Sequence, residues 1–435
     1  MLKIGCAKVD ITPDFPVYLR GYASRNELSN AIEERLSAGI MLLAQGRSRH
    51  LLLTVDSLGI GIRECERIYR DLEKATGYKE AQIYLACSHT HFAPGLDDDC
   101  VIRPGGKLKP GIYPAEPEYY PFFLGQLVRG IAEAEKSLEA VSLEETAIPV
   151  PPVLFNRRTI ERESGKVVTN YLYPENPEDY RFQPVDPELM VWRFKKTDGG
   201  IKAIIGRFGC HAVTGGRNQY AISADYPGYF QTFIQKEFGC PGYFLLGTAG
   251  DVVPLQRNGS SRQDIADVLV KSIRLAERTF RMVDEFKLEG TTIQVPVTLR
   301  VKCSRQDADK ILAKVLKENE GANFDGDRCL LGVYAVHNVK TYPKDRVELP
   351  LRLLRLGDRV LVGMPFEVLT EIGLRLRKSC PNAILTSITG GYEGYLPLAK
   401  DYRLGGYEST LGAQFNCRAG DDFLKAAIAA VKAFG

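Results

Sequence analysis

Long hydrophobic runs are missing from this sequence, and so is an excess of charge of either sign. No stretch of about 18 consecutive apolar residues occurs anywhere, which argues against a membrane-spanning helix. The 57 Lys and Arg residues against 54 Asp and Glu leave a net charge of +3, and the basic residues are spread along the chain. We therefore expect no integral membrane segment and no nucleic-acid partner.

A secretory signal and a disulfide pattern are also missing. Lys8 and Asp10 interrupt the N-terminal segment, so it lacks the apolar core of a signal peptide. The ten cysteines are dispersed over the chain and form no CxxC pair, a usage typical of buried thiols in large cytosolic enzymes. We expect a cytoplasmic protein in which all ten cysteines are reduced.

Common catalytic signatures are absent as well. The chain has no GxSxG nucleophile elbow, no GxxxxGK[ST] phosphate loop and no HExxH helix. Cys87 and Cys210 lie next to histidine motifs, but neighbouring residues of a strand point to opposite faces. We therefore expect these two thiols in the apolar core rather than as nucleophiles.

The composition that remains is that of a folded globular protein, with 44% hydrophobic and 26% charged residues over 435 positions. Apolar, β-branched runs alternate with helical periods, a pattern that favours a layered α/β fold. The predicted strands are Leu2–Thr12, Ile40–Ala44, His50–Val55, Gln82–Cys87, Leu189–Phe194, Ala203–Cys210, Tyr243–Gly247, Thr291–Lys302 and Arg346–Met364. The predicted helices are Arg63–Thr76, Pro121–Leu138, Tyr226–Phe238, Arg262–Arg281, Gln306–Glu318 and Asp421–Phe434.

Histidine is scarce, yet three of the five histidines follow apolar strands. His89 and His91 end one run and His211 ends another. Residues i and i+2 of a strand point to the same face, and α/β folds place active sites at strand ends. Imidazole is the commonest side-chain ligand of zinc, so these residues predict a metal site. Each could instead be a hydrogen-bonded core or turn residue.

A series of short motifs resembles the neutral and alkaline (non-lysosomal) ceramidases, and specifically their N-terminal catalytic domain. The resemblance runs nearly end to end, and the order of the motifs is more specific than the histidine pair alone. The motifs are Ala7–Pro13, Gly21-Tyr22, Ser88–His91, Leu154–Arg157, Asp186–Leu189, His211–Thr214, Ser223–Tyr229, Gly247–Pro254, Gly363–Glu367 and Tyr392–Thr410.

The resemblance implies one zinc ion per chain, held by four residues. The family's ligands are the first histidine of the HTH motif, the later strand-end histidine, a Glu after a Gly-x-Pro-like turn and a Tyr. These positions match His89, His211, Glu367 and Tyr395. Two alternatives stay open: Glu367 could cap the helix that follows Pro365, and Tyr395 could be a half-buried aromatic.

The resemblance also implies three catalytic residues that do not bind the metal. A second tyrosine lies twelve residues after the ligand tyrosine in the family, which matches Tyr407 in the YEST segment. The other two are His91 and Arg157. Alternatively, Tyr407 could be a half-buried aromatic, and Arg157 with Arg158 a solvated pair. The acids expected to orient loops or ligands are Asp10, Asp225 and Asp251.

Together the pattern and the resemblance predict an α/β fold of the α-β-β-α sandwich type with mixed sheets. We expect a single compact catalytic unit over residues 1–435, with a sub-boundary, if there is one, near residue 289, and no C-terminal β-domain. The implied activity is zinc-dependent hydrolysis of the C–N amide bond of a small or lipid-like N-acyl substrate by metal-activated water. The alternatives are hydrolysis of an ester or lactone at the same site, and a non-catalytic binding protein.

Overall fold

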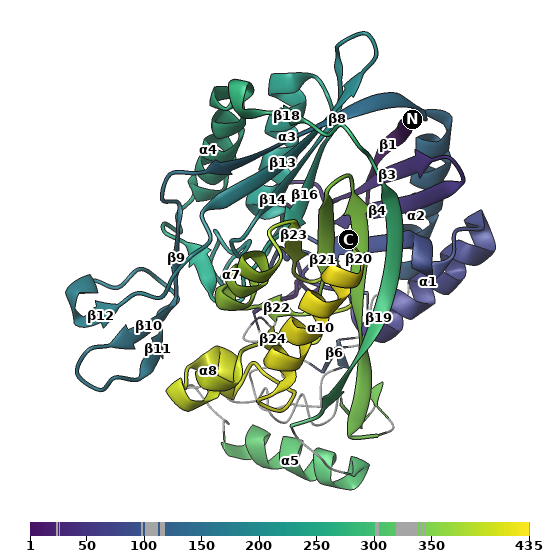
Figure 1. Cartoon of the computed structure of the whole chain (residues 1–435). Coiled ribbons are helices and arrows are strands. Elements are labelled where there is room, and N and C mark those ends of the chain that lie inside the picture. Colours follow the sequence, from purple (N-terminus) through teal and green to yellow (C-terminus); the bar gives the residue numbers. More distant parts are fainter. Residues whose placement is uncertain are drawn as a thin grey trace.

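The larger of two principal sheets has nine strands in the computed structural model of the chain (Figure 1). The structure describes residues 1–22, 25, 27–96, 99–100, 112–113, 118–300, 304–318, 338–339, 341–342 and 344–434. In spatial order the strands are β16 (Gly242–Leu246), β14 (Ile201–Phe208), β13 (Glu188–Lys196), β8 (Glu139–Pro149), β1 (Leu2–Asp10), β3 (Ser37–Gln45), β4 (Ser48–Val55) and β5 (Ile83–Cys87), and β18 (Arg281–Met282) pairs with β8. The sheet is mixed, because β4–β5 and β14–β16 are parallel and the other pairs are antiparallel.

The second sheet has the order β19 (Leu288–Thr298), β20 (Arg346–Leu356), β21 (Arg359–Gly363) and β23 (Ala383–Thr386). The single strand predicted over Arg346–Met364 is wrong, because the chain reverses between β20 and β21. Gly357 makes this reversal in the left-handed region at φ 63°, which glycine adopts without steric cost. Position 289 lies in β19, the first strand of this sheet.

Side-chain alternation along the strands produces the layers. On β3, Ile40 and Leu42 belong to the core beneath the helices, whereas Met41 and Leu43 face the second sheet. Leu354 on β20 meets that same inner core. The outer helices on the large sheet are α1 (Ile62–Thr76), α2 (Tyr119–Lys136), α3 (Asp225–Phe238) and α4 (Ser261–Leu275), and those on the second sheet are α7 (Thr370–Ser379) and α10 (Ala419–Phe434) (Figure 1). The predicted α-β-β-α sandwich with mixed sheets is confirmed.

The two ends of the large sheet's strand order approach each other. Residues of β16 are in contact with β4 and β5, and the Tyr243 hydroxyl on β16 donates to the Ile40 carbonyl on β3 at 3.2 Å. The parallel pairs β4–β5 and β14–β16 therefore lie close to each other. At the carboxyl ends of these pairs the Ser88 N–H donates to the Val55 carbonyl at 2.9 Å, and the Gly247 N–H to the Phe208 carbonyl at 2.8 Å.

The other described elements are short strands and helices. The strands β10 (Arg158–Glu161), β11 (Val167–Thr169) and β12 (Tyr180–Arg181) form an arm that projects from the body (Figure 1). The other pairs are β2 (Ala31–Ile32) with β15 (Ala221–Ile222), β6 (Asp99–Cys100) with β7 (Ile112–Tyr113), β9 (Leu154–Asn156) with β17 (Val252–Pro254), and β22 (Glu367–Val368) with β24 (Tyr395–Leu396). The remaining helices are η1 (Glu80–Gln82), η2 (Pro177–Asp179), η3 (Glu277–Thr279), α5 (Arg305–Glu318), α8 (Ala399–Leu404) and α9 (Tyr407–Thr410).

Most predicted elements are present, with two boundary differences. The helix predicted over Arg262–Arg281 ends at Leu275, because Arg281 pairs with Glu145 as part of β18. The strand predicted over Thr291–Lys302 ends at Thr298, and residues 301–302 lie outside the described part of the chain.

Two expectations from the sequence concern membrane-spanning helices and cysteines, and both can be compared with the described residues. They contain no helix long and apolar enough to cross a membrane. The free cysteines are Cys6, Cys65, Cys87, Cys210, Cys240, Cys380 and Cys417, whereas the side chains of Cys100, Cys303 and Cys329 lie outside the description.

Candidate metal centre

The three strand-end histidines, which follow β5 and β14 of the large sheet, meet in the interior. One possible ligand atom from each of His89, His91 and His211 lies within 4.8 Å of the others, and all three side chains are buried. The ring centroids of His89 and His211 are 4.8 Å apart, and those of His89 and His91 are 4.9 Å apart. The cluster could hold a metal ion.

A turn, rather than strand alternation, brings His89 and His91 together. β5 ends at Cys87, and His89 adopts the left-handed region at φ 64°, which is uncommon for a residue other than glycine. The His89 N–H donates to the Ser57 carbonyl at 2.9 Å, and the His91 N–H to the Ala212 carbonyl at 3.3 Å. The argument from i, i+2 alternation was therefore wrong, although both rings lie in one cluster. Local strain of this kind often accompanies functional sites.

A pair of two-residue strands brings Glu367 to Tyr395. Glu367 on β22 lies directly opposite Tyr395 on β24 in a parallel ladder. The alternative that Glu367 caps the next helix is wrong, because α7 begins at Thr370. The N–H and the hydroxyl of Thr370 both donate to Oδ1 of Asp251, at 2.8 and 2.7 Å.

The ring orientations of two histidines direct unprotonated nitrogens at the Glu367 carboxylate. Nδ1 of His89 lies 2.6 Å from the Leu58 carbonyl oxygen, and Nδ1 of His211 contacts the carbonyl oxygens of Ala249 and Val252. A carbonyl oxygen only accepts, so in both rings Nδ1 carries the proton of the neutral form. Nε2 then presents a lone pair.

The Nε2 atoms of His89 and His211 both face one carboxylate oxygen of Glu367. Nε2 of His211 lies 2.8 Å from Oε2 of Glu367, and Nε2 of His89 lies 3.2 Å from the same oxygen. Burial, together with the Arg157 charge, lowers the pKa of His211 to about 4, so this ring is neutral near pH 7. A cation shared between them would satisfy three such acceptor atoms that face one another. The residues present therefore fit a metal ion.

The carboxylate and the phenol add oxygen donors to this set. Burial favours the neutral form of Glu367, but His89 and His211 offset it and hold the pKa of the carboxyl well below its usual value. Burial raises the pKa of the Tyr395 phenol well above its usual value, with Arg157 opposing the rise and Glu367 adding to it. The side chains of the β22–β24 pair thus lie against histidines that follow strands of the large sheet.

His91 differs from the other two histidines because neither of its ring nitrogens has a hydrogen-bond partner among the described residues. Burial and the neighbouring His89 and His211 lower the pKa of His91 well below its usual value, so the ring is neutral. Gly21 leaves room for it, since a Cβ at that position would lie 2.4 Å from Cγ of His91. The ring is free either to bind a metal or to accept a proton.

Arg157 and Tyr407 both lie against Tyr395. Nη2 of Arg157 donates to the Tyr395 hydroxyl at 2.9 Å, and the ring centroids of Tyr395 and Tyr407 are 5.4 Å apart. Tyr407 is half-buried. The alternative of a solvated Arg157 and Arg158 pair is wrong, because both side chains are buried and both bind Glu408.

Sequence reasoning missed two polar residues that contact the predicted ones, Tyr392 and Glu408, whereas it expected Asp251 to orient a loop or a ligand. The Tyr392 hydroxyl donates to Oε1 of Glu367 at 2.7 Å. Glu408 binds Arg157, and Asp251 both caps α7 and accepts from Asn156 at 2.8 Å. Tyr392 and Glu408 lie inside the Tyr392–Thr410 motif, so their presence in that motif was the only signal available.

Close backbone packing brings the Glu367 strand against the loop after β16. The Gly250 N–H donates to the Val368 carbonyl at 3.0 Å, and a Cβ at Gly250 would lie 2.6 Å from the Glu367 carbonyl oxygen. We expect Gly250→Ala to lower the free energy of unfolding by about 1–3 kcal/mol, because the backbone must move apart. Denaturant titration measures this. Gly259→Ala is the control, because a Cβ there meets nothing within 4 Å; equal stability of the two variants would contradict the prediction.

The fold and the site are those of a layered α/β protein that carries a candidate metal centre. A sequence model described as neutral/alkaline non-lysosomal ceramidase, N-terminal, matches residues 2–244, more than half of the chain. The chain belongs to this family.

Individual relatives are distant. The neutral ceramidase of Pseudomonas aeruginosa is 20% identical over 474 residues, which cover 93% of this chain and 68% of that protein. Neutral ceramidase A of Dictyostelium discoideum is 24% identical over 279 residues, which cover 60% of this chain and 37% of that protein. The chain spans less than half the length of the Dictyostelium relative and of the neutral ceramidase from rice, of which the match covers 42%.

The fold is shared with a solved structure. The crystal structure of the neutral ceramidase from Pseudomonas aeruginosa matches all of this chain and 74% of that one, with a TM-score of 0.77 and 17% identity. A structure titled as a ceramidase complexed with C2 matches with a TM-score of 0.76 and 16% identity. At this identity the likeness establishes the fold alone.

Proposed function

We propose that this protein is a zinc-dependent hydrolase that cleaves the C–N amide bond of an N-acylated substrate. The observation that carries the proposal is the convergence of two imidazole lone pairs on the Glu367 carboxylate. Membership of a family whose curated relatives are named neutral ceramidases supports it.

One zinc ion per chain would be held by His89, His211, Glu367 and Tyr395. Two imidazole nitrogens favour zinc over calcium or magnesium, both of which prefer shells made only of oxygen. When bound, zinc lowers the pKa of a coordinated water towards neutrality and polarises a carbonyl group. The two backbone carbonyls at His211 and the one at His89 keep both rings in the tautomer that presents Nε2.

The chain's own groups would then move the proton and stabilise charge. His91 is buried, neutral and without a partner among the described residues, so it can take a proton from water and pass it to the leaving amine. Tyr407 and Arg157 are the candidate donors to the oxyanion that develops on the carbonyl oxygen. The ring of Tyr171 lies near both, 6.2 Å from the Tyr407 ring and 5.6 Å from the Arg157 guanidinium.

The same groups would serve hydrolysis of an ester or a lactone, since the attacked atom is again a carbonyl carbon. A binding protein without activity is the third candidate. The substrate is proposed to be a small or lipid-like N-acyl compound, and a cytoplasmic location stays a prediction from sequence.

Metal analysis and a substrate panel test the proposal. We expect about one zinc per purified chain, and loss of hydrolysis on treatment with a chelator that zinc restores. The panel compares a ceramide, N-lauroylglycine, N-acetylglycine, a p-nitrophenyl ester and a lactone. Amide cleavage that depends on zinc supports the proposal. Cleavage of the ester or lactone alone would favour the second candidate. Purified protein that holds no zinc and cleaves none of these compounds would overturn the proposal.

A further inference from the structure

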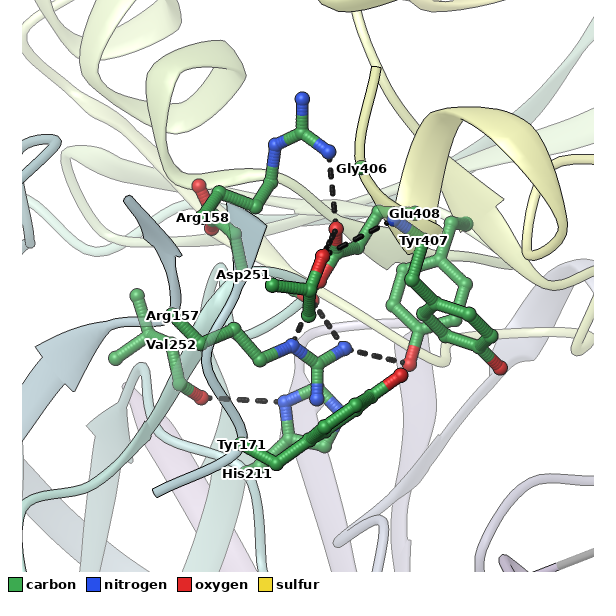
Figure 2. Close-up of polar contacts among 12 residues, drawn as sticks. Arg157, Arg158, Tyr171, His211, Asp251, Val252, Gly406, Tyr407 and Glu408 are labelled. Atoms are coloured by element: carbon green, nitrogen blue, oxygen red, sulfur yellow. Dashed lines mark hydrogen bonds and ion pairs between the residues drawn. The ribbon is translucent and has the colours of Figure 1, made fainter. Parts of the chain in front are cut away.

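Three buried charges form a cluster beside the candidate metal centre (Figure 2). Nε of Arg157 donates to Oε1 of Glu408 at 2.7 Å, and Nη1 of Arg158 donates to Oε2 of Glu408 at 2.9 Å. Arg158 and Glu408 are 0% exposed and Arg157 is 4% exposed. Glu408 thus joins two arginines that are neighbours in sequence. Each of its carboxylate oxygens accepts from a different arginine.

The cluster fixes the guanidinium of Arg157 from several sides. One nitrogen, Nε, is held by Glu408, and Nη2 donates both to the Gly250 carbonyl at 3.1 Å and to the Tyr395 hydroxyl at 2.9 Å. Arg158 makes no contact with Tyr395 that the structure records. Its other anchors are the Gly405 carbonyl at 2.9 Å and the Asp401 carboxylate at 3.9 Å. Its influence on Tyr395 therefore passes through Glu408 and Arg157.

Stability alone is a weak reason for such a cluster. Removing a charge from water costs several kcal/mol per ion, and buried ion pairs are often no more stable than apolar replacements. Burial opposes ionisation of Glu408, yet Arg157 and Arg158 hold the pKa of its carboxyl below the usual value. The arrangement instead fixes an orientation. The planar guanidinium of Arg157, held at Nε, cannot turn away from the Tyr395 phenol.

We propose that Glu408 and Arg158 are positioning residues that hold Arg157 against the Tyr395 hydroxyl and so fix this phenol for metal binding. The inference rests on the proposed function, because it takes Tyr395 as a metal ligand. Partners behind a ligand orient it, and their loss typically lowers metal affinity by about 10- to 100-fold.

Zinc affinity measured by competition with chelators of graded strength tests this without a substrate. We expect Glu408→Gln to weaken zinc binding by about 10- to 100-fold and Arg158→Met by about tenfold. Arg158→Met keeps the Arg157 and Glu408 ion pair, although it removes the partner of Asp401, so it keeps the test available if Glu408→Gln does not fold. In a Tyr395→Phe background neither substitution should weaken zinc binding further, because the hydroxyl through which they act is gone.

A remote buried arginine provides the control. Arg193 is 5% exposed and pairs with Glu144 and Glu277, both at 2.7 Å, away from the candidate centre. Arg193→Met should lower the melting temperature while zinc affinity stays unchanged. Wild-type affinity in both Glu408→Gln and Arg158→Met, or equal losses with and without the Tyr395 hydroxyl, would overturn the inference alone. Absence of tight zinc binding in the unaltered protein would overturn the proposed function, and this inference with it.

Discussion

We expect the replacement of His211 with alanine to remove tight zinc binding and, with it, metal-dependent hydrolysis. Nε2 of His211 makes the shorter of the two histidine contacts to Glu367, and the ring is held by the Ala249 and Val252 carbonyls. Apparent zinc-binding free energies of about 10–16 kcal/mol, divided among four ligands, amount to roughly 3 kcal/mol per ligand. That corresponds to more than about a hundredfold in affinity. Metal analysis after dialysis and chelator competition measure the loss, and His89→Ala should behave in the same way.

His50→Gln is the matched control for this result. His50 is also a buried imidazole, and burial lowers its pKa, but it lines a small cavity between the two sheets with Gly290 and Arg352. Its replacement should leave zinc content and affinity unchanged. Full zinc occupancy in His211→Ala would remove His211 from the ligand set.

Replacing His91 with alanine should preserve zinc while lowering turnover by about a hundredfold or more. The expected loss is that of a proton shuttle, because His91 is neutral and neither ring nitrogen has a partner among the described residues. Tyr407→Phe should also keep zinc and lose a similar factor, the usual cost of one oxyanion donor. Steady-state kinetics on the best substrate of the panel, with zinc content measured in parallel, checks both variants.

Tyr402→Phe is the control for the tyrosine, since the Tyr402 hydroxyl donates to the Phe415 carbonyl at 3.1 Å and not to a candidate site residue. It should turn over substrate nearly as well as the unaltered protein. Loss of zinc from His91→Ala would make His91 a ligand, in line with its place in the three-histidine cluster. Near-normal turnover of Tyr407→Phe would remove Tyr407 from the mechanism.

The layered fold could be predicted because its signals are local. Strands such as β3 and β4 carry apolar side chains on both faces, and their helices show clear amphipathic periods. The hairpin at Gly357 was missed, since apolar residues continue on both sides of a two-residue turn. A run of this kind does not reveal where a strand reverses.

The candidate site could be predicted only in part, because its assembly is not local. The β22–β24 pair that joins Glu367 to Tyr395 is two residues long on each side, too short for any periodic signal. The approach of β16 to β5 depends on how the large sheet curls. Burial of an arginine cannot be predicted from residue type, because Arg is usually exposed. Arg158 could therefore be taken for a surface residue.

The placement of the centre between two sheets has a consequence for its maturation during translation. The histidines follow strands of the large sheet and lie within residues 89–211. Glu367, Tyr395 and Glu408 come from β22, β24 and α9, which lie after β21 of the second sheet in the chain. A nascent chain therefore exposes its nitrogen donors long before the oxygen donors have been synthesised. The segment that matches the family model, residues 2–244, holds the former and none of the latter. Incomplete chains would thus lack the proposed hydrolytic centre, and its activity would begin only once the second sheet has docked on the first.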